Sequence, residues 1–212
     1  FPDMAPVFST LGDVRRQQEQ YDDAIAAYNR TLELMPQEGR GRWFIHYARA
    51  ISHERLDNWE MAEADFRQAL ALNSEQPQVL NYLGYSMVEK QINLDEALGM
   101  IELAVSKEPE SGYIVDSLGW VLYRIGKYEE AVAPMERAVE LVSNDPIIND
   151  HLGDVYWKVN RKREAEFQWS RALSLKPEEK DASRIRRKLE VGLDTVLEEE
   201  GTAEKTAAGN DN

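Results

Sequence analysis

The sequence copies one pattern about every 34 residues, and this feature constrains the fold more than any other. Ala97, Ala131 and Ala165 follow one another at intervals of 34 residues, and Ala24 and Ala62 fill the same role in two earlier copies. A fixed period of this length is typical of stacked helical arrays, in which each repeat contacts only its neighbours. The period therefore predicts one elongated array with a continuous core, and it argues against catalysis.

The copies define repeat units near residues 5–38, 43–76, 77–111, 112–145 and 146–179. Each unit contains two apolar stripes separated by a short turn. In the fourth unit, Val115, Leu118, Gly119 and Leu122 follow the i, i+3, i+4, i+7 spacing of one helix face. Gly126 then interrupts the pattern before the second stripe begins. The sequence thus predicts an all-α fold built from helix-turn-helix units.

These residues carry a resemblance to the tetratricopeptide repeat. In the fifth unit, the residues that match its pattern are Leu152, Gly153, Tyr156, Ala165, Trp169, Ala172 and Pro177. The resemblance implies a right-handed superhelical solenoid of about five such units. The stretch from Ile114 to Arg124 is similar to C-terminal arrays of bacterial cell-envelope tetratricopeptide proteins, including lipoprotein adaptors for proteases. This narrower resemblance favours the periplasmic side of the envelope, with the cytoplasm as the alternative.

Residues beyond the fifth unit are expected to close the array. Ile185, Leu189, Leu193 and Val196 share one apolar face, which predicts a capping helix over 180–197. Residues 198–212 have no aromatic or branched aliphatic side chain, so we expect a disordered tail. No comparable cap precedes the first unit, and we expect further repeats or a domain upstream of it. The basic cluster formed by Arg184, Arg186, Arg187 and Lys188 is interpreted as a solvated helix face.

Composition and motifs exclude several classes of function. A formal net charge of −14 argues against binding nucleic acid or an anionic membrane surface, and no apolar run is long enough to insert into a bilayer. The chain has no cysteine, no phosphate-binding loop and no nucleophile elbow. His46 and His53 lie seven residues apart, too far along a helix to share a metal ion. We therefore predict no catalytic residues, no metal and no cofactor.

In tetratricopeptide arrays a second stripe of the first helix lines a concave groove that binds partners, and the resemblance assigns that role here to eleven residues. They are Tyr47, Ile51, Asn81, Tyr85, Val88, Asp116, Trp120, Tyr123, Asp150, Asp154 and Trp157. Their aromatic members are the side-chain types that most often anchor a binding partner. The carboxylates are expected to attract lysine or arginine on a bound segment. Packing against the neighbouring repeat is the alternative for the aromatic residues. Tyr21, Trp59, Tyr128 and Trp169 are instead expected to lie in the core.

The sequence therefore predicts a non-catalytic protein-interaction scaffold or adaptor that binds a protein or peptide segment in the groove. Two alternatives remain open. Apolar residues of the first repeat, Val7, Phe8 and Leu11, could stack on another copy and form a homo-oligomer. The chain could also be the regulatory arm of a larger protein with an upstream domain.

Overall fold

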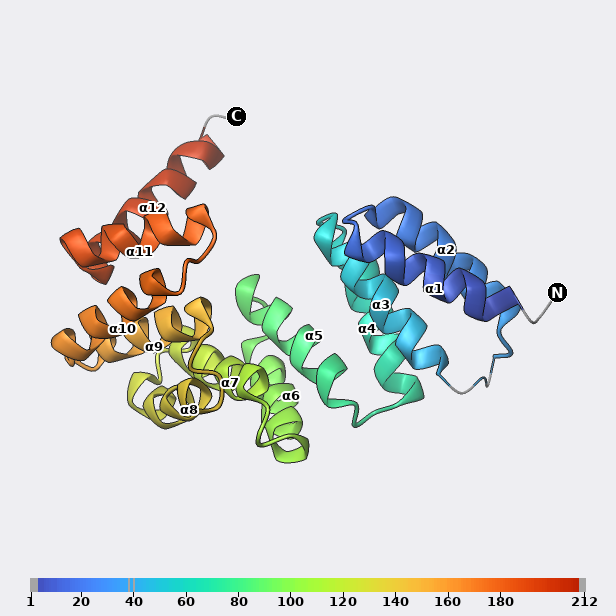
Figure 1. Cartoon of the computed structure of the whole chain (residues 1–212), viewed down its shortest axis with the longest axis horizontal. Coiled ribbons are helices and arrows are strands. Elements are labelled where there is room, and N and C mark those ends of the chain that lie inside the picture. Colours follow the sequence, from blue (N-terminus) through green and yellow to red (C-terminus); the bar gives the residue numbers. More distant parts are fainter. Residues whose placement is uncertain (1–3, 38, 40, 210–212) are drawn as a thin grey trace. The chain divides into compact units, whose positions relative to one another are not determined.

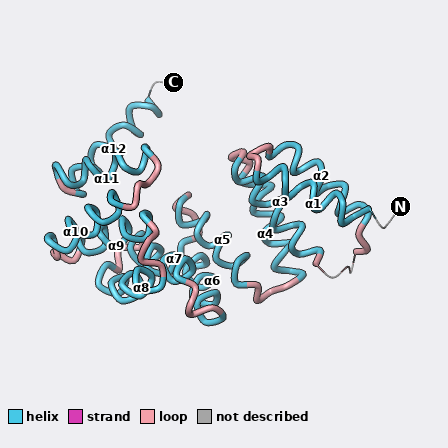
Figure 2. The backbone as a smooth tube through the Cα atoms, viewed as in Figure 1, coloured by secondary structure: helices cyan, strands magenta, loops and turns pink. Residues whose placement is uncertain are grey.

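The computed structural model describes residues 4–37, 39 and 41–209, with side chains described as far as Gly201. All regular elements in this part of the chain are helices (Figures 1 and 2). They are α1 (Ala5–Gln17), α2 (Tyr21–Leu34), α3 (Arg42–Arg55), α4 (Trp59–Leu72), α5 (Pro77–Glu89), α6 (Leu94–Lys107), α7 (Gly112–Arg124), α8 (Tyr128–Leu141), α9 (Pro146–Lys158), α10 (Lys162–Ser174), α11 (Glu179–Val191) and α12 (Leu193–Gly209). None of the described helices combines the length and the apolarity needed to cross a bilayer.

The chain divides inside α5 into two compact units, one ending at Ser86 and the other beginning at Met87. This differs from the single continuous body expected from the repeat period. The helices nevertheless follow the repeat, because α1–α2, α3–α4, α7–α8 and α9–α10 are the most extensively packed pairs. Trp169 is fully buried as predicted, whereas Tyr21, Trp59 and Tyr128 are only half-buried.

In the turn between the two helices of each pair, the second residue after the first helix has a left-handed backbone. These five residues are Glu19, Asp57, Gln91, Gly126 and Asn160, with φ between 56° and 82°, and the α5–α6 turn contains a further left-handed residue, Asn93. A left-handed residue ends a helix by allowing the next amide groups to bond back to its last carbonyls. Only one of the five is glycine, so the repeat tolerates the steric cost of the conformation at the other four.

The N-terminal compact unit, which ends at Ser86, is stabilised by a small apolar core and a buried polar cluster. Tyr28 is fully buried, and its hydroxyl donates a hydrogen bond of 2.8 Å to Asp13. On the opposing pair, the Asp65 carboxylate accepts two hydrogen bonds of 2.6 Å from Arg49. His46 Nδ1 lies 2.8 Å from the same carboxylate. The arginine and the histidine together compensate for burying the charge of Asp65.

In the C-terminal compact unit, which begins at Met87, close contact between helices depends on small residues. Ala131, Ala138 and Ala165 are completely buried, and Gly153 lies directly against the indole of Trp169. A Cβ atom at position 153 would lie 2.4 Å from that ring, which is impossible without movement. The absence of a side chain at Gly153 therefore lets α9 and α10 approach each other.

The C-terminal end differs from the predicted single capping helix over 180–197. Gly192 ends α11 and α12 begins at the next residue, so the cap is a helical hairpin. Gly192 has φ 84° and ψ 157°, a conformation restricted to glycine, and a Cβ there would lie 2.5 Å from the Trp157 ring. The expected disordered tail is also helical as far as Gly209, while residues 210–212 lie outside the described part.

Candidate functional site

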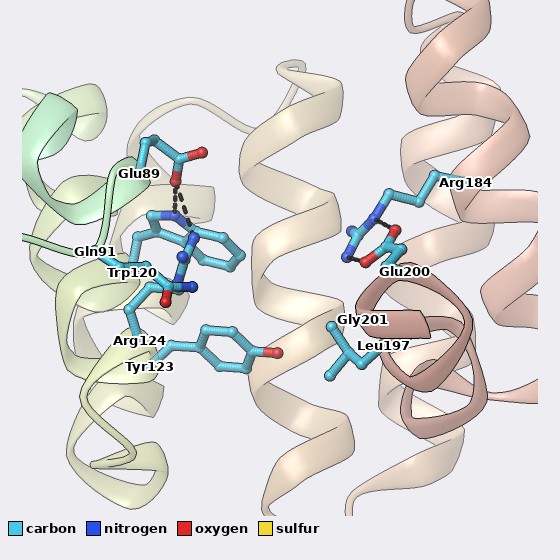
Figure 3. A pocket seen from close by; sticks show the side chains of 9 residues that line it. All are labelled: Glu89, Gln91, Trp120, Tyr123, Arg124, Arg184, Leu197, Glu200 and Gly201. Carbon is cyan, nitrogen blue, oxygen red and sulfur yellow. Dashed lines mark hydrogen bonds and ion pairs between the residues drawn. The ribbon is translucent and has the colours of Figure 1, made fainter. Parts of the chain in front are cut away.

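The C-terminal compact unit contains a pocket of about 410 Å³. Its lining residues are Glu89, Gln91, Trp120, Tyr123, Arg124, Arg184, Leu197, Glu200 and Gly201. The end of α5, the following turn and α7 form one side of the pocket, and α11 and α12 form the other (Figure 3). Two predicted groove residues, Trp120 and Tyr123, thus lie in one site with residues of the C-terminal hairpin.

Trp120 is the centre of an aromatic stack. Its indole ring lies 3.9 Å from the ring of His151 and 4.9 Å from that of Tyr123, centroid to centroid, and nearly parallel to both. Its Nε1 donates a hydrogen bond of 2.7 Å to Glu89, and Arg124 lies near the same ring. Only 8% of Trp120 is exposed. Most of this side chain is therefore enclosed by packing, the alternative given for the aromatic residues, and its remaining surface lines the pocket.

The hydroxyl of Tyr123 is a polar atom on this aromatic side of the pocket. The side chain is also only 8% exposed, and its hydroxyl points across the pocket towards Leu197 (Figure 3). Burial, and to a smaller extent the charge of Asp154, raise the pKa of Tyr123. The phenol therefore stays protonated and can donate a hydrogen bond. Within the described part of the chain it has no hydrogen-bond partner.

Two ion pairs stand on opposite sides of the pocket (Figure 3). Arg124 lies 3.3 Å from Glu89, the carboxylate that also accepts from Trp120. Arg184 donates two hydrogen bonds, of 2.7 and 3.2 Å, to Glu200. Burial opposes the charge of Arg184, but Glu200 and two nearby aspartates outweigh this effect and raise its pKa. Both guanidinium groups are therefore already matched by carboxylates of the chain itself.

The two predicted groove carboxylates of α9 are not free to bind a partner. Lys188 of α11 donates hydrogen bonds of 2.8 Å to both oxygens of Asp150 and one of 2.7 Å to Asp154. Lys188 is 1% exposed, so it does not belong to the solvated basic face predicted from its sequence neighbours. Asp154 also accepts from the indole of Trp169. The α11 helix therefore occupies this part of the groove.

Burial raises the pKa of Asp150 to about 6, and the repulsion of Asp154 adds to this effect while Lys188 opposes it. Asp116, the third predicted groove carboxylate, is buried beside His151, whose Nδ1 lies 3.1 Å from both of its oxygens. Burial lowers the pKa of His151, but the neighbouring aspartates outweigh it and the net shift is upward. The upward shift at His151 reflects the nearby carboxylates, whereas the shift at Asp150 reflects mainly its burial.

Trp157, the last predicted anchor, is held by the hairpin. Its Nε1 donates a hydrogen bond of 2.8 Å to Asp194, and its ring rests on Gly192. Lys162 Nζ lies 3.5 Å above the ring centroid. The C-terminal hairpin therefore engages Trp157 in intramolecular contacts, as Lys188 does for Asp150 and Asp154.

The remaining predicted residues do not join the pocket. Tyr47, Ile51, Asn81 and Tyr85 are half-buried and belong to the first unit, where Tyr47 packs against neighbouring aromatic rings. Val88 is completely buried and therefore cannot line a groove.

Sequence reasoning missed the pocket residues Glu89, Gln91, Arg124, Leu197 and Glu200, because they lie outside the predicted stripe. It also missed the role of Lys188, although a signal was present. That lysine falls three residues after Ile185 on the buried face of its helix, where a solvated residue is not expected. Among the described residues, no group of three or more acidic or histidine side chains could hold a metal ion.

Comparison with known families identifies the repeat. Models of the tetratricopeptide repeat match residues 3–75 and 89–146, together more than half of the chain. The chain is 28% identical over 113 residues to the TPR repeat-containing protein PA4667 of Pseudomonas aeruginosa, which is 53% of this chain and 18% of that protein. It is 31% identical over 110 residues to the Lipoprotein NlpI homolog of Haemophilus influenzae, 50% of this chain and 34% of that protein. The chain therefore spans only about a fifth to a third of these relatives.

Solved structures show the same fold at low sequence identity. PilF of Pseudomonas aeruginosa superposes with a TM-score of 0.74 at 22% identity, covering 96% of this chain and 89% of that one. YrrB, described as a tetratricopeptide protein with an unusual peptide-binding site, has a TM-score of 0.62 at 17% identity, covering 85% and 90%. At such identities the likeness establishes the all-helical repeat fold alone.

Proposed function

Because this chain belongs to the tetratricopeptide-repeat family, whose members are generally non-catalytic scaffolds for protein interaction, we propose that it is an adaptor that binds a segment of a partner in the pocket beside Trp120 and Tyr123. One observation carries this proposal. The pocket offers an aromatic wall and a neutral hydroxyl that is hydrogen-bonded to no described residue. Because this hydroxyl faces the pocket, it is free to donate a hydrogen bond to a bound segment.

The geometry supports binding rather than catalysis. Asp150 and Asp154 are the acidic pair that could perform acid–base chemistry, but both are hydrogen-bonded to Lys188. A general base must reach the proton that it removes. These carboxylates face the interior of the α9–α11 contact instead of the pocket, so we assign them a structural role.

A side chain that fills the pocket tests the proposal. Gly201 lines the pocket and a Cβ there meets open space, so Gly201→Trp should obstruct the pocket without forcing the fold apart. Gly99, in α6, is equally open and does not line the pocket, which makes Gly99→Trp a matched control. Each variant would be used to capture partners from a lysate of the source organism, with mass spectrometry as the readout.

The expected result is a protein captured by the wild type and Gly99→Trp but lost with Gly201→Trp. Circular dichroism would verify that all three chains are equally helical. Equal capture by the two tryptophan variants would contradict binding in this pocket.

Self-assembly is a second candidate, and exposed apolar residues on α1 favour it. Val7, Leu11 and Val14 are 58%, 41% and 42% exposed, whereas Ile148 and Leu152, the residues of the fifth repeat that correspond to Val7 and Leu11, are buried. A second copy could cover this stripe. Sedimentation velocity would test it: a dimer or larger species that dissociates in Leu11→Lys supports self-assembly, and a monomeric wild type at micromolar concentration refutes it.

We further propose that the protein acts on the periplasmic side of a bacterial envelope. Support comes from the matched Haemophilus influenzae relative, which is named as a lipoprotein. Fractionation of cells that express the natural gene product would test this location. Recovery in the cytoplasmic fraction would refute it.

A further inference from the structure

Building on the proposed function, we infer that the pocket binds a basic partner segment, with a lysine or arginine side chain entering between the Tyr123 wall and the α12 wall. The chemistry follows from the charges that surround the pocket. Figure 3 shows Glu89 and Glu200 on opposite sides of the space into which the Tyr123 hydroxyl points. The side chains of both glutamates are about half-exposed, so a ligand can reach them.

Carboxylates outnumber fixed cations in and directly behind the pocket. The carboxylates are Glu89, Asp116, Asp150, Asp154 and Glu200, and the fixed cations are Arg124, Arg184 and Lys188. His151 can add one further positive charge, and the neighbouring aspartates raise its pKa even though burial opposes its protonation. The site therefore has a negative excess that a cationic side chain would reduce.

An acidic segment fits the same site less well. Arg184 already donates to both oxygens of Glu200 and lies 3.6 Å from Asp154. Arg124 is paired with Glu89. Arg124 bonds to Glu89 through Nη1 alone and has further N–H donors, so a carboxylate could reach it without displacing Glu89, but it would then be repelled by Glu89 at short range. A cation can use the free Oε2 of Glu89, because Trp120 and Arg124 both bond to Oε1, and it gains from the excess of carboxylates.

The protein itself supplies a precedent for lysine binding. Lys188 enters the neighbouring part of this face and bonds to carboxylates on successive turns of α9, at 2.7–2.8 Å. Its ammonium also lies 5.7 Å from the centroid of the Trp169 ring. The pocket repeats this combination of carboxylates beside an aromatic side chain, with Trp120 and Tyr123 in place of Trp169, but it leaves the cation position to a partner.

Charge-swapped peptides would test the inference. The probes are three dye-labelled 12-residue peptides with one alanine- and leucine-rich sequence, in which four positions are all Lys, all Gln or all Glu. Dissociation constants are measured by fluorescence anisotropy for the wild-type chain. The key variant is Glu89→Gln/Glu200→Gln. Its matched control is Glu110→Gln/Glu140→Gln, which makes the same change in net charge and also releases an arginine, Arg137, from its two partners.

We expect the Lys peptide to bind best, with about a tenfold loss of affinity in the pocket variant and less than about a twofold loss in the control. Equal losses in the two variants would show attraction to the overall negative charge alone and would overturn the inference. Failure of the Lys peptide to bind would overturn it as well.

The two tryptophan variants separate this inference from the proposed function. If the Glu peptide binds the wild type and Gly99→Trp but not Gly201→Trp, the pocket is a binding site and the basic partner is refuted. If bound peptides do not distinguish Gly201→Trp from Gly99→Trp, the pocket itself is refuted as the site.

Discussion

Replacing Lys188 by methionine should be among the most destabilising single changes in the second unit. Lys188 is 1% exposed, and its ammonium makes three hydrogen bonds of 2.7–2.8 Å to Asp150 and Asp154. Methionine fills a similar volume but leaves two buried carboxylates without their main partner. Removing one member of a buried ion pair costs about 3–5 kcal/mol of unfolding free energy. Arg184, at 3.6 Å from Asp154, offsets part of the loss, so we expect about 3 kcal/mol.

Hydrogen exchange on the native chain is the appropriate assay, because two compact units need not unfold together. Exchange in peptides from α9 and α11 should become faster in Lys188→Met, while peptides from α3 and α4 keep their rates. Arg187→Met is the matched control. It removes the same charge from the same helix, but Arg187 is exposed and pairs with Glu190 and Glu199 at the surface, so little change is expected.

Neutralising the aspartates should reverse the effect. In Lys188→Met/Asp150→Asn/Asp154→Asn no buried charge is left unpaired, and an asparagine at 154 still accepts from the Trp169 indole. We expect this triple variant to recover to within about 1 kcal/mol of the wild type. A loss below about 1 kcal/mol in Lys188→Met would refute the reasoning, since the lysine would then not compensate a buried charge. Failure of the triple variant to recover would assign the loss to packing instead.

Three further predictions concern stability. Gly153→Ala places a Cβ 2.4 Å from the Trp169 ring and should destabilise the second unit by about 1–3 kcal/mol, measured by the same exchange assay. Gly99→Ala adds a methyl group in open space on α6 and should stabilise that unit by about 0.5–1 kcal/mol; a loss of stability would show that neighbouring atoms crowd this position. The third concerns pH: the folded-state pKa of His151 is raised above 6.5, so the unfolding free energy should fall as pH rises above about 6.5, and this slope should disappear in His151→Gln. An unchanged slope in that variant would assign the titration to another group.

The repeat period predicted the helix pairs because that information is local. Apolar residues three and four apart define each helix face, and Gly153 and Ala165 mark where two helices must approach closely. The same period placed Trp120 on the stripe away from the partner helix. It did not predict that the indole would be enclosed, because its neighbour His151 comes from the next repeat, 31 residues later.

The 34-residue pattern ends before the C-terminal hairpin, so it could not predict the structure of that segment. Lys188 stands beside arginines in the sequence and reads as part of a solvated face, yet its partners lie 34 and 38 residues away. The break between α11 and α12 depends on one residue, Gly192, whose backbone conformation and contact with Trp157 both require glycine. An apolar stripe continues across that position, so the stripe alone predicted one helix where there are two.

The hairpin also determines which part of the repeat surface is available for binding. It covers Asp150, Asp154 and Trp157 of the fifth repeat, so their groove positions are used for intramolecular contacts. It leaves one face of the fourth repeat open and supplies the facing wall from Leu197 and Glu200. Residues outside the repeat pattern therefore make up about half of the pocket. Because each tetratricopeptide unit resembles the next, the proposed binding in this pocket would take much of its specificity from the segment that is not a repeat.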